Sequence, residues 1–236
     1  MILLEVNEIS TYYDAALALD KVSLELNEGE LIALIGSNGS GKSTLLKAIA
    51  GLVTPAKGFI KLFGHEIQNK KPHDIARLGV AYIPEDRSLF VSMTIKENLE
   101  LGAYIHPKKK NKLMEDALDL FPELGDKLNR LSGTLSGGQR QMLSMAMGIM
   151  SDPKLYLIDE PSLGLSPVIF KKLFRAIDAL NKERRVTILL VEQDVNLALQ
   201  IAGRAYVLES HKIVMQGNAS ELLNNTQVRK AYLGLA

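Results

Sequence analysis

The 236-residue sequence is almost neutral, with 28 basic and 27 acidic side chains, and 47% of its residues are hydrophobic. This composition is typical of a globular chain with a sizeable core. It excludes disordered and collagen-like classes, and it lacks the broad positive charge expected when the main partner is nucleic acid. The absence of cysteine excludes disulfides, thiolate metal sites and cysteine nucleophiles. No run approaches the roughly 20 apolar residues of a membrane-spanning helix, so a membrane role is expected to depend on a partner.

The first third of the chain is predicted to be rich in strands. Residues 4–9 alternate imperfectly between apolar and polar, residues 22–26 alternate cleanly, and residues 59–64 resemble another sheet segment. An apolar run at residues 31–35 precedes a glycine-rich turn, and residues 44–50 then have the composition of a helix. Strand, loop and helix in this order are the context in which phosphate-binding loops occur.

The middle of the chain is predicted to be helical, because apolar residues recur at helical intervals in residues 94–99 and 112–118. We expect a helical subdomain at residues 86–151, inserted into an α/β nucleotide-binding core of residues 1–85 and 152–236. Together they would form a single domain over the whole chain.

The core is expected to resume after this insertion. Residues 155–158 and 186–191 are apolar enough for strands covered on both faces, and a helix is predicted near residues 170–181. Alternating strands and helices indicate a parallel sheet. The lysine run at residues 108–112 is interpreted as a solvated linker without a function of its own.

A phosphate-binding loop is predicted where the strand at residues 31–35 meets the following helix. The segment from Gly36 to Thr44 matches the pattern G-x-x-x-x-G-K-[ST]. Glycines let successive backbone N–H groups point at phosphate oxygens, Lys42 reaches the β- and γ-phosphates, and the hydroxyl of Ser43 is expected to bind Mg²⁺. The residues predicted to bind ATP in this loop are Gly36, Ser37, Asn38, Gly39, Ser40, Gly41, Lys42, Ser43 and Thr44.

The remaining chemistry of ATP hydrolysis is predicted at the end of the strand at residues 155–158. Asp159 follows the apolar run directly and is assigned to Mg²⁺, and Glu160 is assigned as the base that polarises the attacking water. The sequence therefore predicts an ATPase that uses ATP and Mg²⁺, with Lys42 and Glu160 as catalytic residues.

A second anion site is predicted at residues 135–139, which read LSGGQ. A hydroxyl and glycine amides at the start of a helix can hold a phosphate. This motif, between the phosphate loop and the Asp-Glu pair, resembles the signature of the nucleotide-binding subunits of ABC transporters. The resemblance implies that Ser136, Gly137, Gly138 and Gln139 of one protomer close over the ATP that the other protomer holds.

The resemblance covers nearly the whole chain and implies its fold class, partners and location. The expected fold is α/β, a P-loop NTPase with a RecA-like parallel sheet, an N-terminal antiparallel β portion and an inserted helical subdomain. The expected partners are a second copy or a second ABC ATPase in a dimer, membrane permease subunits and, indirectly, a periplasmic or extracellular solute-binding protein, with no nucleic acid. The chain would then lie at the cytoplasmic face of the plasma membrane, held there by the permease.

Two further positions carry over from the family. Tyr13 resembles the aromatic residue that stacks on adenine, with Tyr12 as a competitor for that role. Glu85 stands where the family usually has a glutamine that links the metal, the water and the membrane partner. A carboxylate can still bind Mg²⁺ or its water, but it cannot donate an amide hydrogen bond.

Two departures from the family concern the loops around the γ-phosphate. Ser166 replaces the usual aspartate of the loop that crosses the dimer interface, and Gln193 replaces the usual switch histidine. Gln193 is the third predicted catalytic residue. Its amide can donate to the γ-phosphate but cannot take up a proton, so hydrolysis is not expected to depend on a titrating histidine there.

The combination of these departures with the C-terminal segment at residues 231–234 resembles the second of the two ATP-binding subunits of branched-chain amino-acid importers. Urea and short-chain amide importers remain an alternative. A soluble ABC ATPase without a transport role is a further one, although that class usually carries tandem cassettes or a long coiled-coil insertion. A non-catalytic module would be expected to lose Lys42, Asp159 or Glu160, and all three are present.

Overall fold

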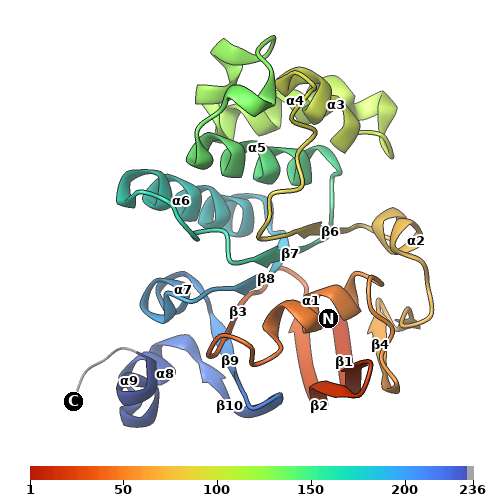
Figure 1. The fold of residues 1–236 in the computed structure, drawn as a ribbon, viewed down its shortest axis with the longest axis vertical. Helices are drawn as coiled ribbons and strands as arrows, with labels where there is room; N and C mark the ends of the chain where they lie inside the picture. The colour runs from red at the N-terminus through yellow and green to blue at the C-terminus, as the bar shows by residue number, and fades with distance from the viewer. Residues whose placement is uncertain (233–236) are drawn as a thin grey trace.

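The computed structural model describes residues 1–232 and folds them into two β-sheets and a helical layer (Figure 1). Leu233 and Gly234, which belong to the C-terminal segment used for the subfamily prediction, lie outside the described residues. Within residues 1–232, no helix is both long and apolar enough to cross a bilayer.

The N-terminal part forms a four-stranded sheet with the order β2-β1-β4-β5. Its strands are β1 (Ile2–Tyr13), β2 (Ala16–Asn27), β4 (Lys57–Leu62) and β5 (His65–Glu66). β1 pairs antiparallel with both β2 and β4. The strands predicted from apolar and polar alternation in this region are confirmed, and the predicted antiparallel portion is this sheet.

The second sheet has the order β10-β9-β3-β8-β7-β6. Its strands are β3 (Leu31–Ile35), β6 (Val80–Ile83), β7 (Leu155–Asp159), β8 (Thr187–Val191), β9 (Arg204–Glu209) and β10 (Lys212–Asn218). β6, β7, β8, β3 and β9 run parallel, and β10 pairs antiparallel with β9. The segments that follow the parallel strands therefore emerge at one edge of the sheet, where α/β proteins bind ligands.

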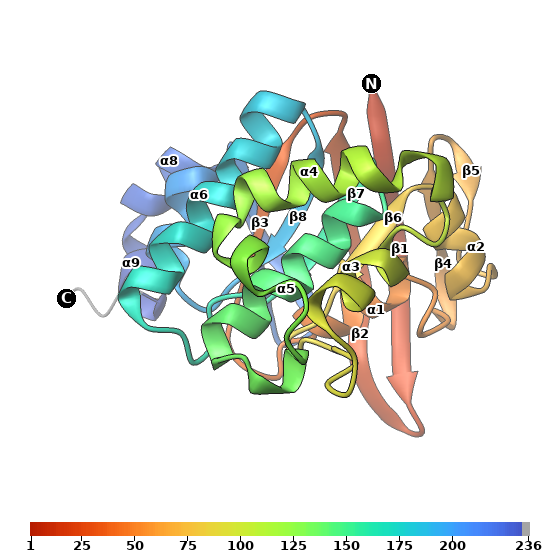
Figure 2. The ribbon, with the colours of Figure 1, turned by 90° about the horizontal axis from the view of Figure 1, so that it is seen from above.

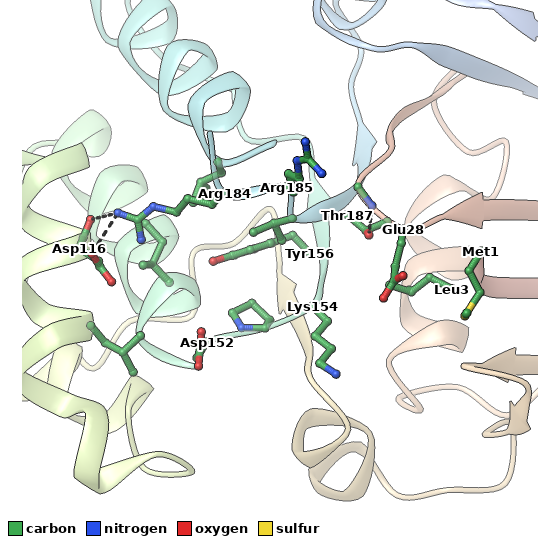
Figure 3. A pocket seen from close by; sticks show the side chains of 16 residues that line it. Met1, Leu3, Glu28, Asp116, Asp152, Lys154, Tyr156, Arg184, Arg185 and Thr187 are labelled. Atoms are coloured by element: carbon green, nitrogen blue, oxygen red, sulfur yellow. Dashed lines mark hydrogen bonds and ion pairs between the residues drawn. The ribbon is translucent and has the colours of Figure 1, made fainter. Parts of the chain in front are cut away.

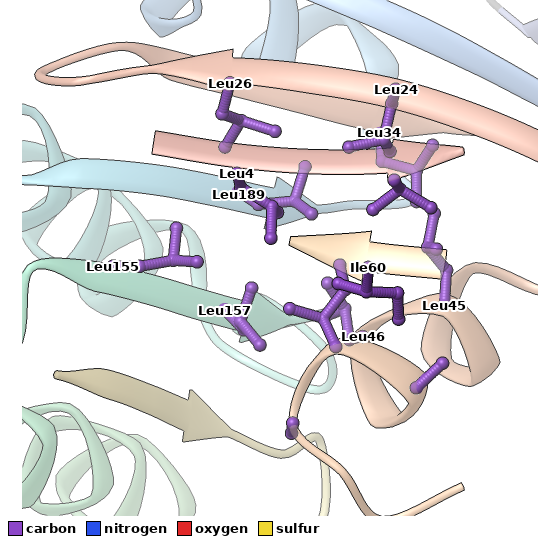
Figure 4. Close-up of a cluster of buried hydrophobic side chains, with 14 of the residues drawn as sticks. Leu4, Leu24, Leu26, Leu34, Leu45, Leu46, Ile60, Leu155, Leu157 and Leu189 are labelled. Atoms are coloured by element: carbon purple, nitrogen blue, oxygen red, sulfur yellow. The ribbon is translucent and has the colours of Figure 1, made fainter. Parts of the chain in front are cut away.

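A hydrophobic core joins the two sheets around helix α1 (Lys42–Ile49). Leu45 and Leu46 of α1 point among side chains of both sheets, including Leu4, Ile60 and Leu157 (Figure 4). The remaining helices of the core are α2 (Pro72–Arg77), α6 (Pro167–Arg184), α7 (Val195–Ile201), α8 (Ala219–Asn224) and α9 (Thr226–Tyr232). Since α1 is packed on two sheets, the loop that precedes it is held rigidly.

Three helices between β6 and β7 form the layer that covers α6 and the end of the sheet (Figures 1 and 2). They are α3 (Ile95–Gly102), α4 (Lys110–Leu120) and α5 (Gly137–Met150), with 3₁₀ turns at Pro107–Lys109, Pro122–Lys127 and Ser132–Thr134. The apolar spacing thus predicts their positions correctly. Where the domain boundaries fall stays a prediction.

The lysine run was wrongly assigned to a linker. Lys108 and Lys109 lie in a 3₁₀ turn, and Lys110 begins α4. Lys109 forms an ion pair with Asp152 at 2.6 Å, which connects the start of α4 to the turn before β7. Exposed ion pairs of this kind make small contributions, so packing of the apolar face decides that this segment is helical.

Candidate active site

The phosphate loop runs from the end of β3 to the first turn of α1, as its sequence predicts. Gly41 caps α1 with a φ of 111°, and a Cβ there would lie 2.5 Å from the carbonyl oxygen of Ala18. A Cβ on Gly36 would lie 2.1 Å from the carbonyl oxygen of Leu208. Both positions therefore admit only glycine, since the loop is wedged between β2 and β9 with no room for a side chain.

Lys42 lies inside this loop with 4% of its surface exposed. Its Nζ donates hydrogen bonds to the carbonyl oxygens of Gly36 at 2.9 Å and Ser37 at 3.0 Å, and lies 3.6 Å from Oε1 of Glu160. A buried ammonium held in this way is a fixed positive charge at the centre of the loop, where it is suited to phosphate oxygens.

Ser43 and Asp159 form the second part of the site. The Ser43 hydroxyl donates to Oδ1 of Asp159 at 3.0 Å, and the Tyr82 hydroxyl donates to Oδ2 at 3.1 Å. Asp159 is only 2% exposed, and burial raises the pKa of its carboxyl, against the two hydrogen bonds that lower it. A hydroxyl beside a carboxylate is the hard oxygen set that Mg²⁺ prefers, so these residues fit the predicted ion.

Glu160 and Gln193 face each other across the ends of β7 and β8. The Gln193 amide Nε2 donates to Oε2 of Glu160, whose other oxygen faces Lys42. Glu160 is 8% exposed, and its backbone has a φ of 43°, in the left-handed region. Glu160, assigned to the attacking water, and Gln193, assigned to the γ-phosphate, are thus in direct contact.

One pocket of about 450 Å³ unites most of the predicted site. Its lining includes the predicted residues Tyr13, Asn38, Gly39, Gly41, Lys42, Ser43, Thr44, Glu85, Glu160 and Gln193. Tyr12, the alternative residue for stacking on adenine, is not among its lining residues. Leu17, Ala18 and His211 also line the pocket and were missed, because nothing in the sequence brings the turn between β9 and β10 next to β2.

The polar atoms around this pocket include one buried group without a partner. Among the described residues, Ser40 Oγ has no hydrogen-bond partner within the chain. No cluster of three or more His, Cys, Asp or Glu side chains suitable for a metal occurs within residues 1–232.

A second cavity, of about 700 Å³, lies at the opposite, amino-terminal ends of β7 and β8 (Figure 3). The Arg184 guanidinium and Asp116 form an ion pair at 3.3 Å on one side, and the ring of Tyr156 crosses the middle. None of the predicted site residues lines it. The chemistry therefore assigns the smaller pocket to the nucleotide.

The signature residues lie at the start of α5. Ser136 caps this helix, and its Oγ accepts from the backbone N–H of Gln139, whose side chain accepts from the N–H of Ser136. A Cβ on Gly138 would lie 2.7 Å from Ile169 of α6, so the close approach of the two helices requires glycine there. Among the described residues, none of the four signature residues lines the nucleotide pocket.

Tyr82 and Glu192 are polar residues of the site that the sequence reasoning missed. Tyr82 is the third residue of β6, and only the pairing of β6 with β7 brings it to Asp159. Glu192 follows β8, has no exposed surface, and accepts hydrogen bonds from the backbone N–H and the hydroxyl of Ser162. Burial raises the pKa of Glu192 to about 7, although these hydrogen bonds lower it.

The raised pKa of Glu192 predicts a pH dependence of stability. The folded chain binds a proton at Glu192 more tightly than the unfolded chain does, because the pKa is about 7 in the first and 4.5 in the second. Protonation of Glu192 therefore stabilises the fold. This stabilisation is fully present below pH 4.5 and is lost as the pH rises through 7. The loss is at most about 3 kcal/mol. We expect the difference in unfolding free energy between wild type and Glu192→Gln to fall over this range, as measured by urea unfolding. A difference that does not change with pH would contradict the assignment.

The Tyr82 hydroxyl is expected to hold Asp159 for the metal. Tyr82→Phe keeps the ring and removes the bond to Oδ2. A hydrogen bond to a charged group contributes about 1.5–3 kcal/mol, and we expect the Mg²⁺ concentration for half-maximal ATP hydrolysis to rise about 10- to 100-fold. Tyr104→Phe, at an 82% exposed tyrosine, is the control. An unchanged Mg²⁺ requirement in Tyr82→Phe would show that Asp159 needs no such support.

Comparison with known proteins agrees with this geometry. Residues 19–163 match the ABC transporter family. The chain is 44% identical to the high-affinity branched-chain amino acid transport ATP-binding protein BraG of Pseudomonas aeruginosa, over 98% of this chain and all of that protein. It is 41% identical to the probable branched-chain amino acid transport ATP-binding protein LivF of Archaeoglobus fulgidus, over 91% of each chain. The solved ADP conformation of an ATP-binding cassette of an ABC transporter superposes on the whole chain with a TM-score of 0.85 at 27% identity.

Proposed function

The chain belongs to the ABC transporter family of ATPases, and on that premise we propose that it powers the import of branched-chain amino acids through partner permeases. The observation that carries the ATPase activity is that Lys42, Ser43 and Glu160 line one pocket, while Asp159 is bonded to Ser43 in the neighbouring cavity. The amino-acid substrate rests on the likeness to BraG and LivF, both of which match over nearly their whole length.

In the proposed reaction the loop amides and Lys42 bind the phosphates, and Glu160 accepts a proton from the attacking water. The base lies at the end of a buried strand, so its position is fixed before the nucleotide arrives, and the rate gain comes from orientation and charge. Gln193 is already bonded to Glu160 and can turn its amide to the γ-phosphate.

Mg²⁺ would be held by Ser43 and Asp159, with Glu85 as the third proposed residue. Glu85 is exposed and lines both the nucleotide pocket and a neighbouring cavity that contains Ser43 and Asp159. When bound, the ion would neutralise charge on the phosphates. The chain's own contribution is to hold the carboxylate of Asp159 between two hydroxyls.

The proposed active unit is a head-to-tail dimer with two ATP molecules. The nucleotide pocket of one chain contains the phosphate loop and the base but none of the described signature residues. Ser136 is exposed and caps α5 elsewhere on the surface. A second protomer, identical or related, would supply this half of the site.

The proposed permease surface follows the segment after Glu85. A cavity of about 610 Å³ there is lined by Lys47, Leu52, Tyr82 and Glu85, among others. Phe90, on the same segment, is 53% exposed, and exposed apolar groups beside a polar cavity are typical of protein interfaces. A permease seated there would reach a Mg²⁺ residue directly and would hold the chain at the cytoplasmic face of the membrane.

Complementation of transport tests this function. The chain is expressed in cells that lack the BraG-type subunit of a branched-chain amino-acid importer and in cells that lack the ATPase subunit of a urea importer. Uptake of labelled leucine is measured in the first and uptake of labelled urea in the second. We expect leucine uptake to be restored by the wild type and not by Glu160→Gln, with urea uptake unchanged. Restored urea uptake without leucine uptake would overturn the proposed substrate.

A further inference from the structure

A closed ring of contacts connects the loop after β7 to the loop after β8. Glu160 and Ser162 lie on the first loop, and Glu192 and Gln193 lie on the second. Gln193 bonds to Glu160 through its side-chain amide, and Ser162 bonds to Glu192 through both its backbone and its hydroxyl. The two loops are therefore joined twice, at the base itself and two residues after it.

Glu192 is the centre of this ring. Its Oε1 accepts from the Ser162 N–H at 3.0 Å, and its Oε2 accepts from the Ser162 hydroxyl at 2.7 Å and from the Gln193 N–H at 3.1 Å. No part of Glu192 is exposed. A buried carboxylate with several donors has one orientation, because every other rotamer would leave a buried polar group unpaired.

The backbone of Glu160 has a conformation that the ring of contacts helps to hold. Its φ of 43° is rarely adopted by residues other than glycine, and such a conformation persists only where surrounding contacts enforce it. On one side, the N–H of Glu160 donates to the carbonyl oxygen of Val191 at 2.9 Å. On the other side, Ser162 is held by Glu192. The two contacts together fix the direction in which the Glu160 side chain leaves the strand.

We propose that Glu192 is a positioning residue for ATP hydrolysis: by holding Ser162 and the backbone of Gln193, it keeps Glu160 and Gln193 aimed at the γ-phosphate. This inference rests on the proposed ATPase function. Neither Glu192 nor Ser162 is among the residues that line the nucleotide pocket, so both act on the reaction through Glu160 and Gln193. ATP binding, which depends on the phosphate loop, is left unchanged by their loss.

A pair of serine variants provides the main test, with ATP hydrolysis measured in the assembled transporter of the uptake experiment. Ser162→Ala removes the hydroxyl bond and keeps the backbone bond, whereas Ser162→Thr keeps both. We expect kcat to fall about tenfold in Ser162→Ala, with KM for ATP within about twofold of wild type and a folded chain whose melting temperature is lowered by no more than about 10 °C. Ser162→Thr is expected to retain kcat within about threefold of wild type, because the hydroxyl is present.

Glu192→Gln extends the test to the carboxylate itself. The new amide has an NH₂ group, which cannot accept a hydrogen bond from Ser162 or Gln193, so at least one of these contacts is lost. We expect kcat to fall by more than in Ser162→Ala, about 100-fold. In a Glu160→Gln background, Glu192→Gln is expected to change the residual rate by less than about twofold, because the base that it positions is gone. Should Glu192→Gln fail to fold, the alanine and threonine variants still decide the question.

The outcomes separate this inference from the proposed function. Hydrolysis by the wild type together with an unchanged kcat in folded Ser162→Ala would overturn the positioning role alone. A rise in KM with kcat unchanged would also overturn it, because the residues would then serve binding. Absence of hydrolysis in the wild-type complex would overturn the ATPase function on which the inference depends.

Discussion

Glu160→Gln is expected to lower kcat for ATP hydrolysis by about 10²- to 10⁴-fold, the range that a general base contributes. The amide has nearly the same shape as the carboxylate but cannot accept the proton of the attacking water. Glu160 lies beside Lys42 and Gln193 and is 8% exposed, so bulk water cannot easily replace it.

The same substitution is expected to leave ATP bound. The phosphate loop and Lys42 are unaltered, and one negative charge is removed near the phosphates, so ATP affinity should be equal to or above that of wild type. Single-turnover hydrolysis and ATP binding measured on the same preparation separate the two effects. Glu183→Gln, at an exposed glutamate on α6, is the control. Hydrolysis at the wild-type rate in Glu160→Gln would show that another group is the base.

Lys42→Ala is expected to weaken ATP binding by about 10- to 100-fold and to abolish measurable hydrolysis. A charged hydrogen bond to phosphate is worth about 1.5–3 kcal/mol, which converts to this range of affinity. The substitution also leaves Glu160 buried without its neighbouring cation, so the carboxylate faces the phosphates with no compensating charge.

Calorimetric titration with ATP in the absence of hydrolysis measures this effect. Lys70→Ala, which removes an exposed lysine remote from the pocket lining, controls for the loss of one positive charge. Binding within about twofold of wild type in Lys42→Ala would place the phosphates elsewhere than in this loop. A fall in melting temperature is also expected, because the substitution removes two hydrogen bonds to the loop and leaves a buried carboxylate without its cation.

The elements that could be predicted from sequence are those with a local signal. Residues 31–35 and 155–158 form strands as expected because continuous apolar runs are stable only when covered on both faces, which parallel strands provide. The helix expected near residues 170–181 is longer, at Pro167–Arg184. Its last residues, 182–184, are exposed and charged and add nothing to the apolar pattern. The lysine run at residues 108–112 was misread because charge alone does not distinguish a loop from the exposed start of a helix.

The sequence by itself determined the phosphate loop, the signature and the Asp159–Glu160 pair, since each is a contiguous motif whose chemistry depends on neighbouring residues. Only the tertiary structure decided which other residues hold these motifs in place. Tyr82 reaches Asp159 because β6 pairs with β7, and Glu192 reaches Ser162 because β7 pairs with β8. These contacts join residues 77 and 30 positions apart, and their register is set by the packing of a buried sheet. No local pattern encodes them, which is why the groups proposed to react could be assigned from the sequence and the groups that hold them could not.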